Sequence, residues 1–411
     1  MKRIYLVLSC FWIAFSGAPR EGWTAPSRPL PRYTFVELGV PSVNTDWVQP
    51  LDINNSGEIV GTGNLIQGSD LPVYRTPDGR MQFLDTLPAQ SPGGSAEAIN
   101  HHGQIVGRLT QRGNEGVVWQ PNGSITDLDA IAEASNMNFN SANDINESGQ
   151  VVGIGVFQVT GITVNRALLW SEQTGLLNLG TLPGLQNSRA SGINDLGQVV
   201  GTCSPPSGGG SRGFIWTQST GMTALGNLPT DVPGSAALSV NDTGQVLGSI
   251  SVRLPSGDNF GTAVRWEASG ALTEIPRFDF ADLQSPLRHV SSSGAAMNSL
   301  GQIVGRNQAV TESFDFVDRD FLWDDEWGLL DIRDLIDETG NGWTILGLSG
   351  INDLGQIIGW ANGPDGQPMG FILNPVPEPE SFVLGLACGA LMLCWLLKRR
   401  RDALSPLRQA A

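Results

Sequence analysis

Histidine, the side chain best suited to proton transfer near neutral pH, occurs three times in the chain. His101 and His102 are adjacent within a short Asn-x-x-Gly segment, and His289 lies in a segment between repeats. The adjacent pair could ligate a metal at the surface, but we favour a solvated turn. The sequence has no Gly-x-Ser-x-Gly, His-Glu-x-x-His or phosphate-binding loop. A serine nucleophile would need a positioned base, which neither histidine position suggests.

Carboxylates are concentrated in one segment. Eleven acidic residues lie between Thr311 and Glu338. Three of them, Asp315, Asp318 and Asp320, are candidate calcium ligands, because calcium prefers oxygen donors from several nearby carboxylates. A solvated acidic surface explains the same residues without a metal, and we favour it. We expect no other cofactor.

One nine-residue phrase occurs seven times: apolar-Asn-x-x-Gly-Gln/Glu-apolar-apolar-Gly. Its Asn residues are spaced 46 to 57 residues apart. Asn-x-x-Gly is typical of a type I turn followed by a left-handed residue, for which Gly carries no Cβ penalty. We therefore interpret the Asn and Gly of each copy as structural. They are Asn54 and Gly57, Asn100 and Gly103, Asn146 and Gly149, Asn194 and Gly197, Asn241 and Gly244, Asn298 and Gly301, and Asn352 and Gly355.

Each repeat holds three more β-prone phrases. One rich in small residues precedes the Asn; another, such as Gly213 to Trp216, follows it; and a Leu-Gly phrase such as Leu176 to Gly180 ends the repeat. Five copies of the second of these end in Trp, which we interpret as core packing, with a row for stacking carbohydrate as the alternative. The first and last copies are expected to end in Tyr74 and Leu373 instead.

Four strands at this period match one blade of a β-propeller, with the small-residue strand innermost. The last repeat lacks its fourth phrase, and a matching phrase, Tyr33 to Pro41, stands at the start of the chain. The first strand should therefore complete the last blade and close the ring, which removes exposed sheet edges. We expect an all-β, seven-bladed β-propeller over residues 33–375.

The innermost strands discriminate between two functional classes. A propeller glycosidase or lyase should place carboxylates at equivalent inner positions on neighbouring blades. Two positions before the apolar residue of each turn, Glu97 is the only acid among the seven copies. Asp52 and Asp144, one position further on, belong to copies that are not adjacent. We therefore favour a non-catalytic binding or scaffold module, with a propeller enzyme acting on polysaccharide as the alternative.

The two ends of the chain have targeting patterns. Residues 1–25 combine a basic start with an uncharged apolar run, which predicts a secretory signal peptide; an uncleaved anchor is the alternative. Residues 382–397 form a second apolar run, which predicts a transmembrane helix. The basic cluster Lys398, Arg399, Arg400 and Arg401 that follows places that end, and the tail 402–411, in the cytoplasm. The chain before residue 376 is then outside the membrane.

The C-terminal segment resembles the PEP-CTERM sorting signal of bacterial envelope proteins. Residues 376–401 contain its three parts: Pro377, Glu378 and Pro379, then the apolar run, then the basic cluster. The resemblance implies recognition by a membrane-embedded exosortase, which releases or re-attaches the protein, and an association with exopolysaccharide production. The extension 402–411 departs from the pattern, and an ordinary membrane anchor is the alternative.

The central repeats resemble the HAF repeats of probable extracellular bacterial proteins. The phrase Leu179 to Gly184 reads Leu-Gly-Thr-Leu-Pro-Gly, as in that family, although the eponymous His-Ala-Phe is absent. The resemblance implies an extracellular location and no particular activity. The partner classes expected are an extracellular polysaccharide or protein.

The charge and cysteine content exclude some functions. The net charge is −16, and Lys2 and Lys398 are the only lysines, so we expect no binding to nucleic acid. Cys203 is the only cysteine between the two targeting segments, so an internal disulfide and a cysteine-based zinc site are excluded there.

Overall fold

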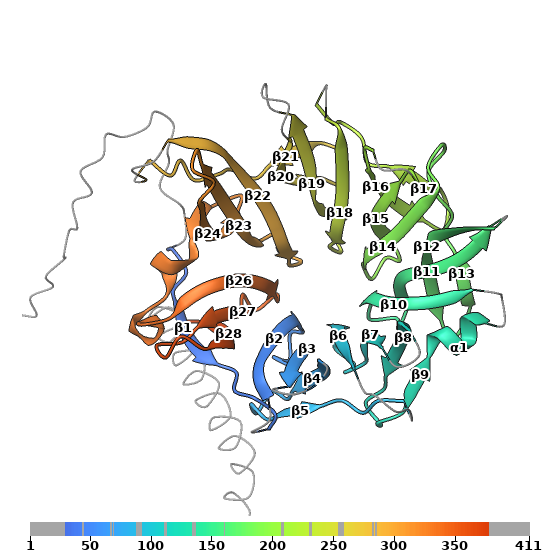
Figure 1. The fold of residues 1–411 in the computed structure, drawn as a ribbon, viewed down its shortest axis with the longest axis horizontal. Helices are drawn as coiled ribbons and strands as arrows, with labels where there is room; N and C mark the ends of the chain where they lie inside the picture. Colours follow the sequence, from blue (N-terminus) through green and yellow to red (C-terminus); the bar gives the residue numbers. More distant parts are fainter. Residues whose placement is uncertain are drawn as a thin grey trace, which may run out of the picture.

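Short strands separated by tight turns form a closed ring in the computed structural model (Figure 1). The structure describes residues 29–377 except 43–44, 66–67, 69, 88–92, 111–112, 134–136, 160, 207–208, 230–231, 254–258, 282 and 284–285. Within this part of the chain the strands make seven four-stranded antiparallel sheets. The chain is a seven-bladed β-propeller, as the repeats predicted.

We number the blades in chain order, and each begins with its innermost strand. Blade 1 contains β2 (Thr45–Ile53), β3 (Ile59–Leu65), β4 (Leu71–Arg75) and β5 (Met81–Phe83). Blade 2 contains β6 (Gly94–Ile99), β7 (Ile105–Leu109), β8 (Glu115–Trp119) and β9 (Ile125–Asp127). Blade 3 contains β10 (Asn138–Ile145), β11 (Val151–Val159), β12 (Ile162–Ser171) and β13 (Gly175–Asn178).

The remaining blades follow the same order. Blade 4 contains β14 (Asn187–Ile193), β15 (Val199–Ser204), β16 (Arg212–Thr217) and β17 (Gly221–Ala224). Blade 5 contains β18 (Gly234–Val240), β19 (Val246–Arg253), β20 (Asn259–Trp266) and β21 (Leu272–Glu274). Blade 6 contains β22 (Leu287–Met297), β23 (Ile303–Thr311), β24 (Phe316–Asp324) and β25 (Gly328–Asp331). Blade 7 contains β26 (Thr344–Ile351), β27 (Ile357–Asn362), β28 (Pro368–Pro375) and the N-terminal strand β1 (Tyr33–Glu37).

The ring closes where the sequence predicted. Strand β1 pairs antiparallel with β28, with Phe35 opposite Leu373. In Figure 1 the N-terminal strand lies among the red strands of the C-terminal blade. The Phe35 ring lies 4.8 Å from that of Phe371 and 4.7 Å from that of Trp343, measured between centroids. This buried aromatic cluster fixes the two ends of the propeller to each other.

The final Gly of the repeated phrase has a packing reason. At the innermost strand pair of each blade the register shifts by one residue, as between Ala190 and Gly192 in blade 4. A Cβ at Gly201 would lie 2.0 Å from the carbonyl oxygen of Arg189, and the equivalent Gly of the other six blades is as crowded. The glycines of the turns are required for a different reason: their backbone is left-handed, with φ between +71° and +80°. Both positions are therefore closed to larger residues.

The cores lie between neighbouring blades. The five Trp residues are the last or the second-last residue of strands β8, β12, β16, β20 and β24. They are buried, with 1 to 9 % exposed, so the core interpretation is confirmed over a stacking row. One detail of the alignment was wrong. Ile105 pairs with Trp119, whereas the equivalent Ile59 pairs with Arg75, so Arg75 and not Tyr74 occupies the Trp position in blade 1. Tyr74 therefore stands at the position before it.

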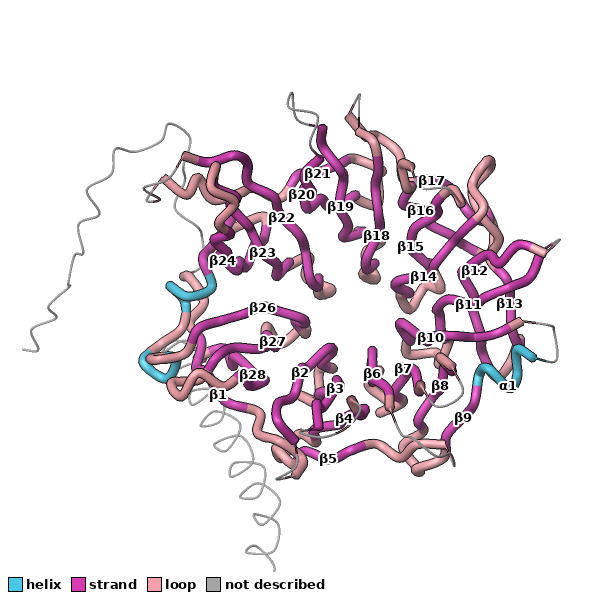
Figure 2. The backbone as a smooth tube through the Cα atoms, viewed as in Figure 1, coloured by secondary structure: helices cyan, strands magenta, loops and turns pink. Residues whose placement is uncertain are grey.

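Helical residues are few and peripheral (Figure 2). They form α1 (Leu128–Glu133) after blade 2, the 3₁₀ turn η1 (Ile332–Leu335) against β24 and β25 of blade 6, and the 3₁₀ turn η2 (Glu338–Gly340) against β1. Within residues 29–377, where described, no helix has the length and apolar character that crossing a membrane requires. The expected signal peptide (1–25), transmembrane helix (382–397) and tail 402–411, with the sorting residues from Glu378 onward, lie outside the described residues.

Candidate functional site

The seven turn asparagines meet around the propeller axis and form a continuous hydrogen-bonded ring. The side-chain amide of each donates to the backbone carbonyl oxygen of the Asn in the next blade, at 2.8 to 3.3 Å. The Oδ1 atom of each accepts the backbone N–H four residues on, at 2.9 to 3.1 Å. The sequence predicted the turns. It did not predict the hydrogen bonds between blades, because a repeat pattern does not specify how close adjacent blades lie in space.

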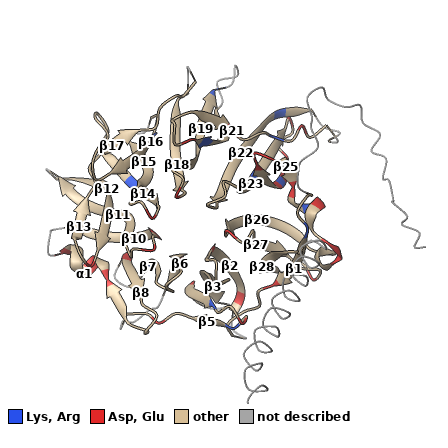
Figure 3. Ribbon diagram, turned by 180° about the vertical axis from the view of Figure 1, so that it is seen from behind, with Lys and Arg blue, Asp and Glu red and all other residues tan. Residues whose placement is uncertain are grey.

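A second set of bonds surrounds the mouth of the axis. At five of the junctions the side chain of the residue after the Asn accepts the backbone N–H of the equivalent residue in the preceding blade. Examples are the bonds from Glu147 to Asp195 at 2.8 Å and from Asp195 to Asp242 at 2.9 Å. In Figure 3 acidic positions lie at the inner ends of the blades. The Asn-Asp pairs of the repeats thus join blades to one another.

Asp52 lines the axial cavity, whose volume is about 300 Å³, together with the turns around the axis. Asp144 holds the equivalent position on the innermost strand of blade 3. The Asp52 carboxylate accepts the N–H of Ile53 at 2.8 Å and of Ile99 at 2.9 Å. Asp144 accepts the N–H of Ile145 and of Ile193, both at 2.8 Å. Each carboxylate therefore joins its own blade to the next.

Burial is the largest cause of the pKa shifts of the Asp52 and Asp144 carboxyl groups. It raises the pKa of Asp144 to about 7, and the negative charge of Asp52 adds to the rise, while the N–H donors Ile193 and Ile145 oppose it. Burial also raises the pKa of Asp52. As predicted, the two acids are on blades that are not adjacent; Ala98 holds the equivalent position in blade 2 between them. They do not form a neighbouring pair of the kind expected in a glycosidase.

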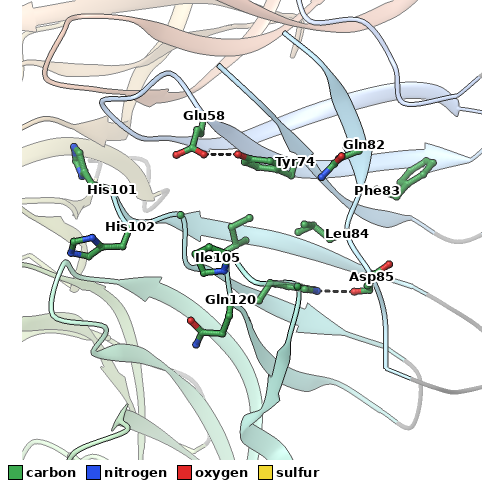
Figure 4. Close-up of a pocket in the computed structure, with 14 residues that line it drawn as sticks. Glu58, Tyr74, Gln82, Phe83, Leu84, Asp85, His101, His102, Ile105 and Gln120 are labelled. Carbon is green, nitrogen blue, oxygen red and sulfur yellow. Dashed lines mark hydrogen bonds between the residues drawn. The ribbon is translucent and has the colours of Figure 1, made fainter. Parts of the chain in front are cut away.

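A larger cavity, of about 550 Å³, lies between blades 1 and 2 (Figure 4). Tyr74 on β4 and Glu58, which directly precedes β3, form one wall of the cavity. The Tyr74 hydroxyl donates a hydrogen bond to Glu58 Oε1. Glu58 Oε2 also accepts from the Asn54 amide at 2.6 Å. Burial and this bond raise the pKa of Tyr74, so the phenol stays a neutral donor. Trp119 and the turn residue Gly103 line the blade 2 side.

Sequence reasoning missed this cavity, although a signal for it was present. Glu58 stands where the other six copies of the phrase have Gln. The two exposed histidines lie at its rim, as Figure 4 shows, and His101 Nδ1 lies 2.6 Å from Glu147 Oε1. Nothing in the described part of the chain groups three or more His, Cys, Asp or Glu side chains so that they could hold a metal ion.

The calcium candidates lie far along the chain from this cavity, in blade 6. Asp318 and Asp320 on β24 are both ion-paired with Arg306, at 2.9 Å each. Asp315, in the preceding turn, accepts from the Ser313 hydroxyl at 2.6 Å. Arg306 supplies the positive charge that a cation would otherwise provide. Calcium binding there stays a prediction.

The chain has distant similarity to several solved structures. The chain is similar to puromycin hydrolase (14 % identity, 82 % of this chain and 52 % of that chain, TM-score 0.46). It is also similar to the polysaccharide lyase Uly1 (9 %, 87 % and 93 %, 0.41) and to the Aleuria aurantia lectin AAL (11 %, 70 % and 96 %, 0.33). It spans about half the length of the puromycin hydrolase chains. At these values the similarity does not bear on activity or ligand.

No protein-family model matches the chain, and no curated protein sequence matches it.

Proposed function

We propose that this protein is an exported β-propeller that binds an extracellular polysaccharide or protein without catalysing a reaction on it. One observation carries the non-catalytic part. The carboxylates of the innermost strands, Asp52 and Asp144, have both oxygens engaged by backbone N–H groups of their own and the next blade. A general acid or base must be within hydrogen-bonding reach of substrate and exchange a proton with it. These side chains instead join blades.

The proposed location rests on the ends of the chain. The apolar run 382–397 between Pro-Glu-Pro and a basic cluster resembles a sorting signal, and the basic start of residues 1–25 resembles a secretory signal. The propeller would then face the outside of the cell membrane, held there or released by an exosortase-type enzyme. The net charge of −16 favours solubility and basic partners.

The experiment for binding uses the full-length protein in detergent, mixed with extracellular polysaccharide and, separately, envelope proteins from its own host. We expect material to be retained on the immobilised protein with unchanged chain length. Shortening of the polysaccharide that disappears in Asp52→Asn or Asp144→Asn would instead establish the propeller enzyme. Retention of neither class of material contradicts the binding role.

The experiment for location is the intact mass of the protein isolated from its native cells. A mass that lacks the residues after about 376 supports release by sorting. The full C-terminal mass in the membrane fraction supports a retained anchor. Recovery from the cytoplasm with residues 1–25 still attached contradicts export.

A further inference from the structure

The cavity between blades 1 and 2 is one member of a set of equivalent grooves between blades. The strand register makes Tyr74 equivalent to Ile215 in blade 4 and to Arg265 in blade 5, because each pairs with the apolar residue directly before the final Gly of the repeated phrase. Likewise Trp119 is equivalent to Trp266 and Trp323. The groove between blades 4 and 5, lined by Ile215 and Trp266, is smaller, at about 300 Å³. The grooves can therefore be compared position by position.

Between blades 5 and 6 the protein fills this groove with its own guanidinium group. The side chain of Arg265 is 4 % exposed and crosses from blade 5 to blade 6. Its Cζ lies 4.8 Å from the centre of the Trp323 ring, and Nη1 donates to the carbonyl oxygen of Gly301 at 3.4 Å. Ion pairs to Glu267 at 2.7 Å and Asp325 at 2.9 Å balance the charge. The groove thus accommodates a planar cation.

Between blades 1 and 2 the same groove is left open. Tyr74 does not cross to blade 2, because its hydroxyl turns back to Glu58 of its own blade. Trp119 and Gly103, the equivalents of Trp323 and Gly301, both line the cavity that remains. Glu58 supplies a carboxylate in this groove, whereas Gln245 and Gln198 hold that position in the other two.

The electrostatics of the open groove suit a cation. Its lining contains Glu58 and Asp85, and no Arg or Lys is among the described residues that line it. Each oxygen of Glu58 accepts one hydrogen bond from the protein, from Tyr74 or Asn54, so each retains a lone pair. In Figure 4 Glu58 and Tyr74 form one side of the cavity, and the lining residues Ile105 and Leu84 lie between this side and Gln120. A charged planar group would meet a carboxylate at one end and apolar side chains along its face.

The geometry points to a binding site, between blades 1 and 2, for the guanidinium group of an arginine side chain from a basic partner protein. In this site the partner's arginine takes the place that Arg265 fills between blades 5 and 6. The inference rests on the proposed binding function and names the chemistry of the partner. It does not depend on how the protein is held at the envelope.

The test measures binding of Nα-acetyl-arginine methylamide to the full-length protein by ligand-observed NMR. Nα-acetyl-citrulline methylamide has nearly the same shape without the charge and should bind at least about tenfold more weakly. Glu58→Gln restores the residue of the other six copies, so it should fold, and it should weaken binding of the arginine probe at least about tenfold. Glu172→Gln removes the same charge from an exposed turn of blade 3 and should leave binding unchanged.

A second variant tests the groove by filling it. Tyr74→Arg copies Arg265 and should abolish binding of the probe while the far-ultraviolet circular dichroism stays that of the wild type. Equal affinity for the citrulline compound, no binding of the arginine compound, or an unchanged affinity in Glu58→Gln would overturn the inference. Binding of a neutral oligosaccharide that Tyr74→Arg blocks would overturn it in favour of a saccharide site. In each of these cases retention of envelope material by the wild type would leave the proposed function standing.

Discussion

The side-chain amide of Asn352 donates a hydrogen bond to the backbone carbonyl oxygen of Asn54 at 3.0 Å, although the two lie 298 residues apart in the chain. This bond joins blade 7 to blade 1 and completes the ring of asparagines around the axis. Strand β1 joins the same two ends of the propeller at its outer edge. Closure is therefore secured both at the axis and at the circumference.

Replacing a ring asparagine should destabilise the fold. Asn194→Ala removes the amide that donates to the Asn241 carbonyl oxygen at 2.8 Å and the acceptor of the Gln198 N–H. Buried groups that lose their partners cost about 1–3 kcal/mol. We expect a loss in the free energy of unfolding of that size or more, measured in urea. The matched control Asn122→Ala, in an exposed turn with only local bonds, should change it by less than about 1 kcal/mol. Equal effects of the two variants would contradict an energetic role for the ring.

Closure at the circumference depends on Phe35. Its side chain is 6 % exposed and packs on Phe371 and Trp343. Phe35→Ala should lower the free energy of unfolding by about 3–5 kcal/mol, because it leaves a cavity between the two ends of the chain. Val36→Ala, on the same strand but 40 % exposed, is the control and should have little effect. If both variants unfold at the same urea concentration, β1 does not close the ring energetically.

Asp144 should make stability depend on pH. Its pKa in the folded protein is about 7, above the value of about 3.9 for an unfolded chain. Because the folded state then binds the proton more tightly, the free energy of unfolding falls as pH rises from about 4 to about 7. The fall due to Asp144 is at most about 4 kcal/mol, from about 1.4 kcal/mol for each unit of pKa difference.

The variant Asp144→Ala isolates this effect, because Ala98 occupies the equivalent position in blade 2. The free energy of unfolding of the variant, relative to the wild type, should be higher at pH 8 than at pH 5. Urea titrations at the two pH values give this difference, and titrating groups that do not interact with Asp144 cancel in it. A difference that is the same at both pH values would show that Asp144 titrates alike in the folded and unfolded chains.

A small guanidinium compound should partly restore the stability that is lost when Arg265 is removed. Arg265→Ala empties the groove between blades 5 and 6 and leaves Glu267 without the guanidinium that now lies 2.7 Å away. We expect a lower thermal midpoint than in the wild type, partly restored by millimolar methylguanidinium, which can enter the vacated space. Methylammonium, which cannot form the paired planar contact, should restore less. Equal rescue by both ions, or an equal shift in the wild type, would contradict specific occupation of the groove.

Several features of the fold could be predicted from local patterns alone. Each Asn-x-x-Gly phrase specifies a turn by its own backbone chemistry, as at Asn194 and Gly197, and seven copies specify the number of blades. The missing phrase of the last repeat predicted that β1 would pair with β28. One residue was misaligned: Tyr74 was assigned to the Trp position because it is also aromatic. The strand pairing gives that position to Arg75, the partner of Ile59.

The candidate site could be predicted much less well, because it lies between repeats. The sequence by itself determined the turns, the strands, the blade number and the closing segment, since these follow from short-range conformational preferences and a period. Only the tertiary structure decided that Asn side chains reach the next blade, that Asp52 and Asp144 join blades, and that Arg265 fills one groove while Tyr74 leaves another open. Those outcomes depend on which side chain crosses a gap between two sheets, and that distance is set by the packing of the whole ring.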